Sequence, residues 1–151
     1  MTEGPDGMVR TSAAAQQADL RSELQQQNRS VLEGLAPQER LAWAHEQFGE
    51  QFALTTSFGI QSSVLLHMLS QLPGGNAVPV IWVDTGYFPA ETYMYVEQLM
   101  ELFDIRLVVA LSAMSPARME ALHGRLWESG TVVDLELYHR IRKVDQLAES
   151  L

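Results

Sequence analysis

The segment from Thr55 to Ser63 carries hydroxyl side chains on five of its nine residues, with Gly59 near its middle. A glycine there allows a tight turn, and hydroxyls and backbone N–H groups at the start of a helix can hold phosphate or sulfate. The segment has no lysine, so it is not a Walker A loop. A serine-rich turn that only caps a helix is the other interpretation, and the segment considered by itself is more typical of such a turn.

A second polar segment, Asp84 to Gly86, directly follows the apolar run from Val78 to Val83. The carboxylate of Asp84 and the hydroxyl of Thr85 could face a ribose or a base, or they could form an Asx turn that caps the next helix. Open parallel sheets bind ligands beyond the carboxyl ends of their strands. Two polar loops at adjacent strand ends therefore favour a binding site over two unrelated turns.

The charge of the chain is uneven. Ten basic and 19 acidic residues give a net charge of −9, which disfavours non-specific binding to nucleic acid or to anionic membranes. No Lys or Arg occurs between Arg40 and Arg106, so an anion bound there would need hydroxyls and backbone N–H groups. A late cluster of Arg140, Arg142 and Lys143 could supply cations, or it could be a solvated helix face.

Several classes of protein are excluded by composition. The chain has no cysteine, which excludes disulfides, thiolate zinc sites, iron–sulfur clusters and a cysteine nucleophile within it. The four histidines are scattered, so we expect no metal site. The apolar stretches are shorter than the ~20 residues that span a bilayer, and the N-terminus has no apolar signal region. We therefore expect a cytoplasmic protein.

The order of the elements predicts the fold class. Short apolar runs alternate with amphipathic helical patterns, which is typical of right-handed βαβ units. The sequence predicts an α/β protein with a doubly wound parallel sheet and helices on both faces, preceded by a flexible tail over residues 1–16. Its expected strands are 52–56, 78–83 and 106–111, and its expected helices are 18–32, 37–48, 60–72, 89–103, 116–123 and 135–151.

Four stretches resemble one known family in order and spacing. They are TTSFGIQSSVLLH, VIWVDTGYFPAETYMYVEQL, GRLWESG and YHRIRKVDQL. They resemble the phosphoadenylyl-sulfate (PAPS) reductases, which belong to the PP-loop, adenine nucleotide α-hydrolase-like superfamily with its Rossmann-like fold. The resemblance covers about Leu35 to Leu151. It implies thioredoxin- or glutaredoxin-dependent reduction of 3′-phosphoadenylyl sulfate to sulfite and adenosine 3′,5′-bisphosphate, a step of sulfate assimilation and cysteine biosynthesis.

The resemblance also implies a set of substrate-binding residues in three groups. The altered PP-loop would hold the phosphosulfate, the Asp-Thr-Gly motif would lie near the adenosine, and the basic cluster would meet the remaining negative charge. In chain order, the substrate-binding residues are Ser57, Phe58, Gly59, Gln61, Ser62, Asp84, Thr85, Gly86, Arg140, Arg142 and Lys143, with Ile60 as a further loop position.

The sequence departs from the family in three places. Tyr138 and His139 stand where adenylyl-sulfate reductases carry a cysteine pair for a 4Fe–4S cluster, so we expect no cofactor. The catalytic cysteine of the family's Glu-Cys-Gly-Leu-His motif is missing, and Gln146 replaces the family's proline. We therefore expect the N-terminal part of the nucleotide-binding domain, residues 17–151, truncated at the C-terminus and inactive by itself.

Two alternatives stay open. One is a catalytically silent adenine-nucleotide-binding module. The other is a PP-loop ATP pyrophosphatase that adenylates its substrate, although Phe58 and Gln61 replace a glycine and the aspartate of that group's Ser-Gly-Gly-x-Asp-Ser loop. The expected partners are the nucleotide substrate and, for the complete enzyme, thioredoxin or glutaredoxin. We expect neither nucleic acid nor a membrane as a partner, and the sequence leaves a homodimer open.

Overall fold

The computed structural model describes residues 22, 25–26 and 29–150. The tail predicted over residues 1–16 and most of the helix predicted over residues 18–32 lie outside the described residues. The chain divides into two compact units, Met1–Trp43 and Ala44–Leu151. In the first unit, residues 29–33 are helical. Helix α2 (Pro37–Phe48) begins where Glu39 Oε2 accepts a hydrogen bond of 2.7 Å from the Ala36 N–H.

The second unit is built on a parallel sheet of three strands within the described residues: β1 (Leu54–Thr56), β2 (Pro79–Asp84) and β3 (Arg106–Leu111). The strands follow one another in sequence order, with Leu54 opposite Val80 and Ile81 opposite Val108. The central strand is apolar on both faces because both faces are covered. The predicted α/β fold class is confirmed.

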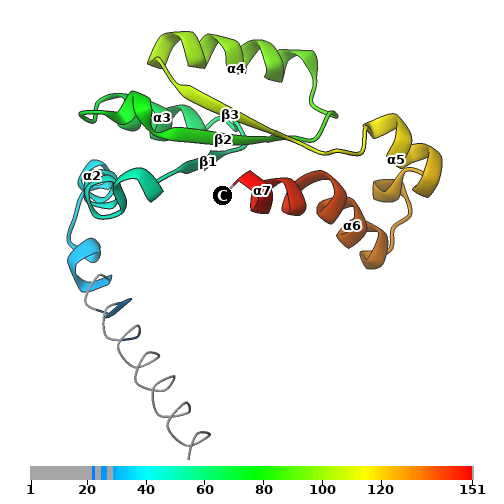
Figure 1. Ribbon diagram of the computed structural model, residues 1–151, viewed down its shortest axis with the longest axis horizontal. Coiled ribbons are helices and arrows are strands. Elements are labelled where there is room, and N and C mark those ends of the chain that lie inside the picture. The colour runs from blue at the N-terminus through cyan, green and yellow to red at the C-terminus, as the bar shows by residue number, and fades with distance from the viewer. Residues whose placement is uncertain (1–21, 23–24, 27–28, 151) are drawn as a thin grey trace, which may run out of the picture. The chain divides into compact units, whose positions relative to one another are not determined.

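One face of this sheet is covered by α3 (Ser62–Ser70) and α4 (Ala90–Phe103), which pack against each other. Right-handed crossovers between sequential strands place their helices on the same face. Each helix buries a pair of apolar side chains one turn apart, Leu66 with Leu69 and Val96 with Leu99. Figure 1 shows α4 lying along the sheet on this side.

The other face is covered by the C-terminal helical run, which Figure 1 draws on the side opposite α4. Helix α6 (Val132–His139) continues through the π-helical segment η4 (Arg140–Val144) into α7 (Asp145–Ser150), and η4 and α7 contact the sheet. The run begins earlier than the predicted Leu135. The Thr131 hydroxyl accepts the Asp134 N–H at 3.2 Å and so caps the helix at Val132.

The remaining elements are short. Helix α5 (Pro116–His123) has the predicted bounds, and its cap residue Ser115 accepts the Arg118 N–H at 3.3 Å. The 3-10 turns are η1 (Gly49–Gln51), η2 (Gly75–Ala77) and η3 (Leu126–Glu128).

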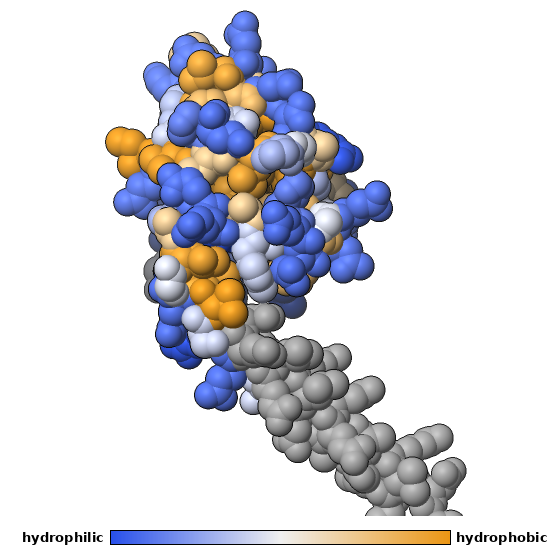
Figure 2. Space-filling model, turned by 90° about the vertical axis from the view of Figure 1, so that its left-hand side faces the viewer, coloured by the Kyte–Doolittle hydropathy of each residue, from blue (hydrophilic) through white to orange (hydrophobic). Residues whose placement is uncertain are grey.

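Large apolar side chains also reach the surface, and Figure 2 shows orange areas separated by blue polar residues on the face it displays. Within the part of the chain that the structure describes, no helix is both long enough and apolar enough to cross a bilayer.

Candidate functional site

A cleft of about 540 Å³ lies between the C-terminal helical run and the carboxyl-terminal parts of β1 and β2, and we call it the β1–β2 cleft. Its polar lining comes from β1, from the loop after it, from the start of α3 and from η4. Its apolar lining comes from β2, the segment after it and the C-terminal helical run. The lining residues are Thr55, Thr56, Ser57, Ser62, Ile81, Val83, Phe88, Lys143, Val144 and Leu147. Of the sequence-predicted binding residues, Ser57, Ser62 and Lys143 are brought together here.

The first turn of α3 is not capped by a serine. Its N-cap residue is Gln61, which makes no side-chain cap hydrogen bond, and Ser63 Oγ donates to the Ile60 carbonyl at 3.2 Å. Within the described residues, the hydroxyls of Ser57 and Ser62 have no hydrogen-bond partner. The predicted serine cap is therefore absent from α3, and both hydroxyls lie near the positive end of this helix.

The tight turn of this loop falls on Phe58 and not on the predicted Gly59. Phe58 has a φ of 52°, in the left-handed region, whereas the φ of Gly59 lies outside it. Two contacts offset the strain: the Phe58 N–H donates to Thr56 Oγ1 at 3.0 Å, and the ring packs edge-on against Trp82 at 5.4 Å. Phe58 is 4% exposed and belongs to the core below the cleft.

The Asp84 to Gly86 segment forms the Asx turn that the sequence left as one alternative. Asp84 Oδ1 accepts the Gly86 N–H at 2.7 Å and the Tyr93 hydroxyl at 2.9 Å. Thr85 is only 4% exposed. None of these three predicted site residues lines the β1–β2 cleft. Burial, followed by the hydrogen bond to Asp84, raises the pKa of Tyr93.

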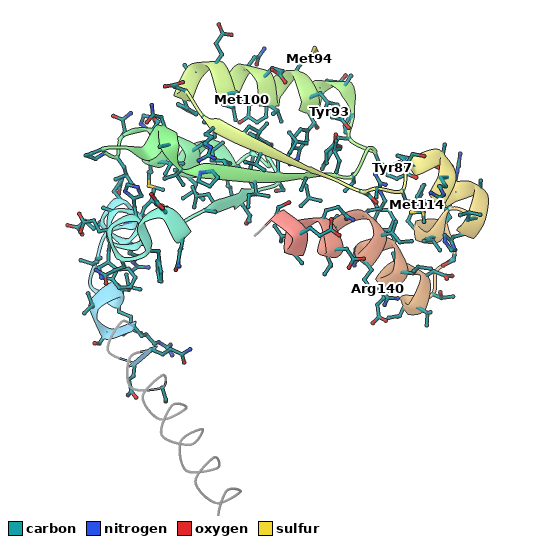
Figure 3. The ribbon with its side chains drawn as sticks, in the orientation of Figure 1. Tyr87, Tyr93, Met94, Met100, Met114 and Arg140 are labelled. Carbon is teal, nitrogen blue, oxygen red and sulfur yellow. The ribbon has the colours of Figure 1, made fainter. Side chains whose placement is uncertain are left out.

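The three cations of the predicted basic cluster have three different environments. Lys143 lines the β1–β2 cleft. Arg140 is exposed and lines a separate surface hollow, and Figure 3 shows it on the side of the helical run away from the sheet. Arg142 is 2% exposed, and its guanidinium donates to the backbone carbonyls of Thr85 and Met114. Only one of the three cations therefore reaches the cleft.

Sequence reasoning missed a polar and aromatic cluster around Tyr87. The Tyr87 hydroxyl donates to Glu120 Oε1 at 2.8 Å, and its ring lies 4.8 Å from the Trp127 ring. Burial, followed by this hydrogen bond, raises the pKa of Tyr87 from 10.0 to about 12. The signal available was the GRLWESG stretch, which contains Trp127 but carries no assigned role.

The lining of the β1–β2 cleft is suited to binding a ligand. Lys143, the two free hydroxyls and the start of α3 suit an anion, while the apolar lining suits a flat or aliphatic group. Among the residues that the structure describes, no three His, Cys, Asp or Glu side chains are grouped to hold a metal ion.

The fold and the cleft define a Rossmann-like α/β protein with a cleft beside the carboxyl-terminal parts of two parallel strands. A family model, the phosphoadenosine phosphosulfate reductase domain, matches residues 51–151. The chain belongs to the PAPS reductase family, which confirms the resemblance of its motifs.

Named relatives agree with this assignment. The phosphoadenosine 5′-phosphosulfate reductase of Synechococcus sp. is 49% identical over 111 residues, which are 74% of this chain and 47% of the relative. That of Zymomonas mobilis is 38% identical over 143 residues, which are 95% of this chain and 57% of the relative. The crystal structure of PAPS reductase from Candida auris, a phosphate complex, matches with a TM-score of 0.66 at 28% identity, over 82% of this chain and 58% of that one. The chain thus spans about half the length of the curated relatives.

Proposed function

We propose that this chain is the nucleotide-binding part of a PAPS reductase and binds 3′-phosphoadenylyl sulfate in the β1–β2 cleft. The phosphosulfate end would lie against Ser57, Ser62 and Lys143. The observation that carries the proposal is the convergence of Lys143 with two hydroxyls that have no partner in the described residues. A charged hydrogen bond from an ammonium group to such an anion is stronger than a neutral one.

The reduction needs a group that these 151 residues do not contain. In the reaction that the family implies, a cysteine thiolate attacks the sulfonate sulfur and displaces adenosine 3′,5′-bisphosphate. Two electrons from a thioredoxin or glutaredoxin dithiol then release sulfite and leave that partner as a disulfide. Because the chain has no cysteine, we assign to it the binding and orientation of the nucleotide, with the thiolate supplied from outside these residues.

The other predicted binding residues have supporting positions outside the cleft lining. The Asx turn of Asp84 and Gly86 directly follows the strand that supplies Val83 to the cleft, so it would shape the adenosine end. Gly59 and Gln61 belong to the loop that presents Ser57 and Ser62. Phe58 would support that loop from below.

The proposal is tested by calorimetric titration with adenosine 3′,5′-bisphosphate, adenosine and ATP with Mg²⁺. We expect the bisphosphate to bind and adenosine to bind far more weakly, because the anion contacts supply much of the affinity. Inorganic phosphate should compete with the bisphosphate. Equal binding of adenosine and the bisphosphate, or no binding of either, would contradict the proposal. Tighter binding of ATP would instead favour the adenylating PP-loop class.

A further inference from the structure

All three nitrogens of the Arg142 guanidinium donate hydrogen bonds to backbone carbonyls. Its Nε donates to the Thr85 carbonyl at 2.8 Å, Nη2 donates to the same oxygen, and Nη1 donates to the Met114 carbonyl. The Tyr87 ring covers the guanidinium, with Cζ 5.7 Å from the ring centroid. No ion pair in the described part of the chain involves Arg142. Its polar neighbours are therefore acceptors fixed in the backbone.

These bonds join three segments that are far apart in sequence. Thr85 lies between β2 and α4, Met114 lies between β3 and α5, and Arg142 lies in η4. Figure 3 shows Tyr87 and Met114 near each other where these segments meet. The packing is close: a Cβ at Gly86 would lie 2.7 Å from Pro116 Cγ and 3.1 Å from Arg142 Nη2. The junction therefore holds the guanidinium in one place.

Lys143, the residue that follows Arg142, points in a different direction from the Arg142 side chain. Consecutive residues of a helix face different directions, so fixing one side chain fixes the direction of the next. With Arg142 buried among the loops, Lys143 faces the β1–β2 cleft. The segment η4 is π-helical, so α-helical spacing alone does not set this rotation.

We propose that Arg142 is a positioning residue, whose guanidinium holds η4 so that Lys143 lies in the cleft. This inference rests on the proposed function, because it assigns Lys143 the contact with the anion. It differs from the direct phosphate contact that the sequence suggested for Arg142. A planar fork of N–H donors can bridge two carbonyls, whereas a lysine ammonium at the same position cannot reproduce that geometry.

The test is a double-mutant cycle on affinity for adenosine 3′,5′-bisphosphate, using Arg142→Lys, Lys143→Gln and both together. Arg142→Lys keeps the charge, so a direct contact with the anion would retain its salt dependence and would still add to the effect of Lys143→Gln. A positioning residue predicts about a tenfold loss in the folded variant. It also predicts no further loss when Arg142→Lys is added to Lys143→Gln, because both changes remove the same contact. Arg140→Gln is the matched control and should bind like the wild type.

Two ligand-independent measurements separate this inference from the proposed function. In the wild type, the Arg142 Nε–H should give a slowly exchanging NMR signal that persists when the nucleotide is added. In Arg142→Lys, amide exchange should rise at residues 85–87 and 114–116 while β2 stays protected. If the wild type binds no nucleotide, the proposed function fails, and these two measurements still decide whether Arg142 holds the loops.

Three results would overturn the positioning role. One is wild-type affinity in folded Arg142→Lys. Another is additive losses in the double variant. The third, which needs no variant, is an Arg142 Nε–H signal that exchanges rapidly in the free protein or changes its hydrogen-bond partner when the nucleotide binds.

Discussion

Lys143 in η4 and Ser62 at the first turn of α3 line the same cleft. The two residues are far apart in the chain, and their helices pack on opposite faces of the sheet. The acidic middle of the chain supplies no lysine or arginine to this cleft. The late basic cluster supplies one cation from the helical run on the other face. In the proposed function, this pairing would let a chain of net charge −9 hold an anion.

Removing the loop hydroxyls should weaken nucleotide binding. Ser57→Ala with Ser62→Ala is expected to lower the affinity for adenosine 3′,5′-bisphosphate by at least about tenfold, because a hydrogen bond to a charged group contributes about 1.5–3 kcal/mol. Calorimetry checks this. Ser63→Ala is the matched control, since its hydroxyl already donates to the Ile60 carbonyl. If Ser63→Ala and the double variant bind equally well, the hydroxyls do not contact the ligand.

The two loop glycines should respond differently to substitution. Gly86→Ala is expected to cost at least about 2 kcal/mol of stability, because Gly86 has a φ of 74° and its Cβ would meet Pro116 Cγ at 2.7 Å. Gly59→Ala is expected to change stability by less than about 0.5 kcal/mol, since the nearest atom, Ser57 Oγ, would lie 3.6 Å away. Chemical denaturation of both variants checks the contrast. Equal losses would contradict this account of the turns.

The Tyr87 hydroxyl should make stability depend on pH in the alkaline range. Its pKa is raised from 10.0 to about 12 by burial and then by Glu120, so folding favours the neutral phenol. Its contribution to stability is fully present below pH 10 and is lost as the pH rises from about 10 to about 12. Denaturation at several pH values should show a shallower decline in Tyr87→Phe. Superimposable curves for this variant and the wild type would refute the assignment.

Reductase activity should be absent from the isolated 151 residues. With PAPS and reduced thioredoxin, we expect no sulfite release above the blank, because no cysteine is present to attack the sulfonate sulfur. The full-length reductase of Synechococcus sp. serves as the positive control. Sulfite release that depends on this chain would show that the family's thiolate chemistry is not needed here.

Local signals in the sequence predict much of the fold. The bounds of β3 and α5 follow from an apolar run after the end of α4 and from the Ser115, Pro116 and Gly124 signals. The sequence does not predict the start of α6. Thr131 caps this helix by accepting a hydrogen bond from the Asp134 N–H, but it directly follows the turn predicted to end at Gly130. Caps of this kind depend on side-chain geometry that a hydrophobic pattern does not contain.

The site is less predictable from sequence than the fold. Arg142 and Lys143 are neighbours with similar charge, yet one is buried and the other lines the cleft. The carbonyl partners of Arg142 lie 57 and 28 residues away, so only the tertiary packing decides its direction. The left-handed conformation of Phe58 has the same origin, because its buried ring and the Thr56 hydroxyl hold it.

The proposed function depends most on Lys143, which would meet the anion of a nucleotide in the β1–β2 cleft. The most direct measurement is calorimetric titration of the wild type, Lys143→Gln and Arg140→Gln with adenosine 3′,5′-bisphosphate at low and moderate salt. We predict that Lys143→Gln binds about tenfold more weakly and with a shallower salt dependence, while Arg140→Gln matches the wild type. Equal affinities and equal salt dependence for the wild type and Lys143→Gln would contradict it.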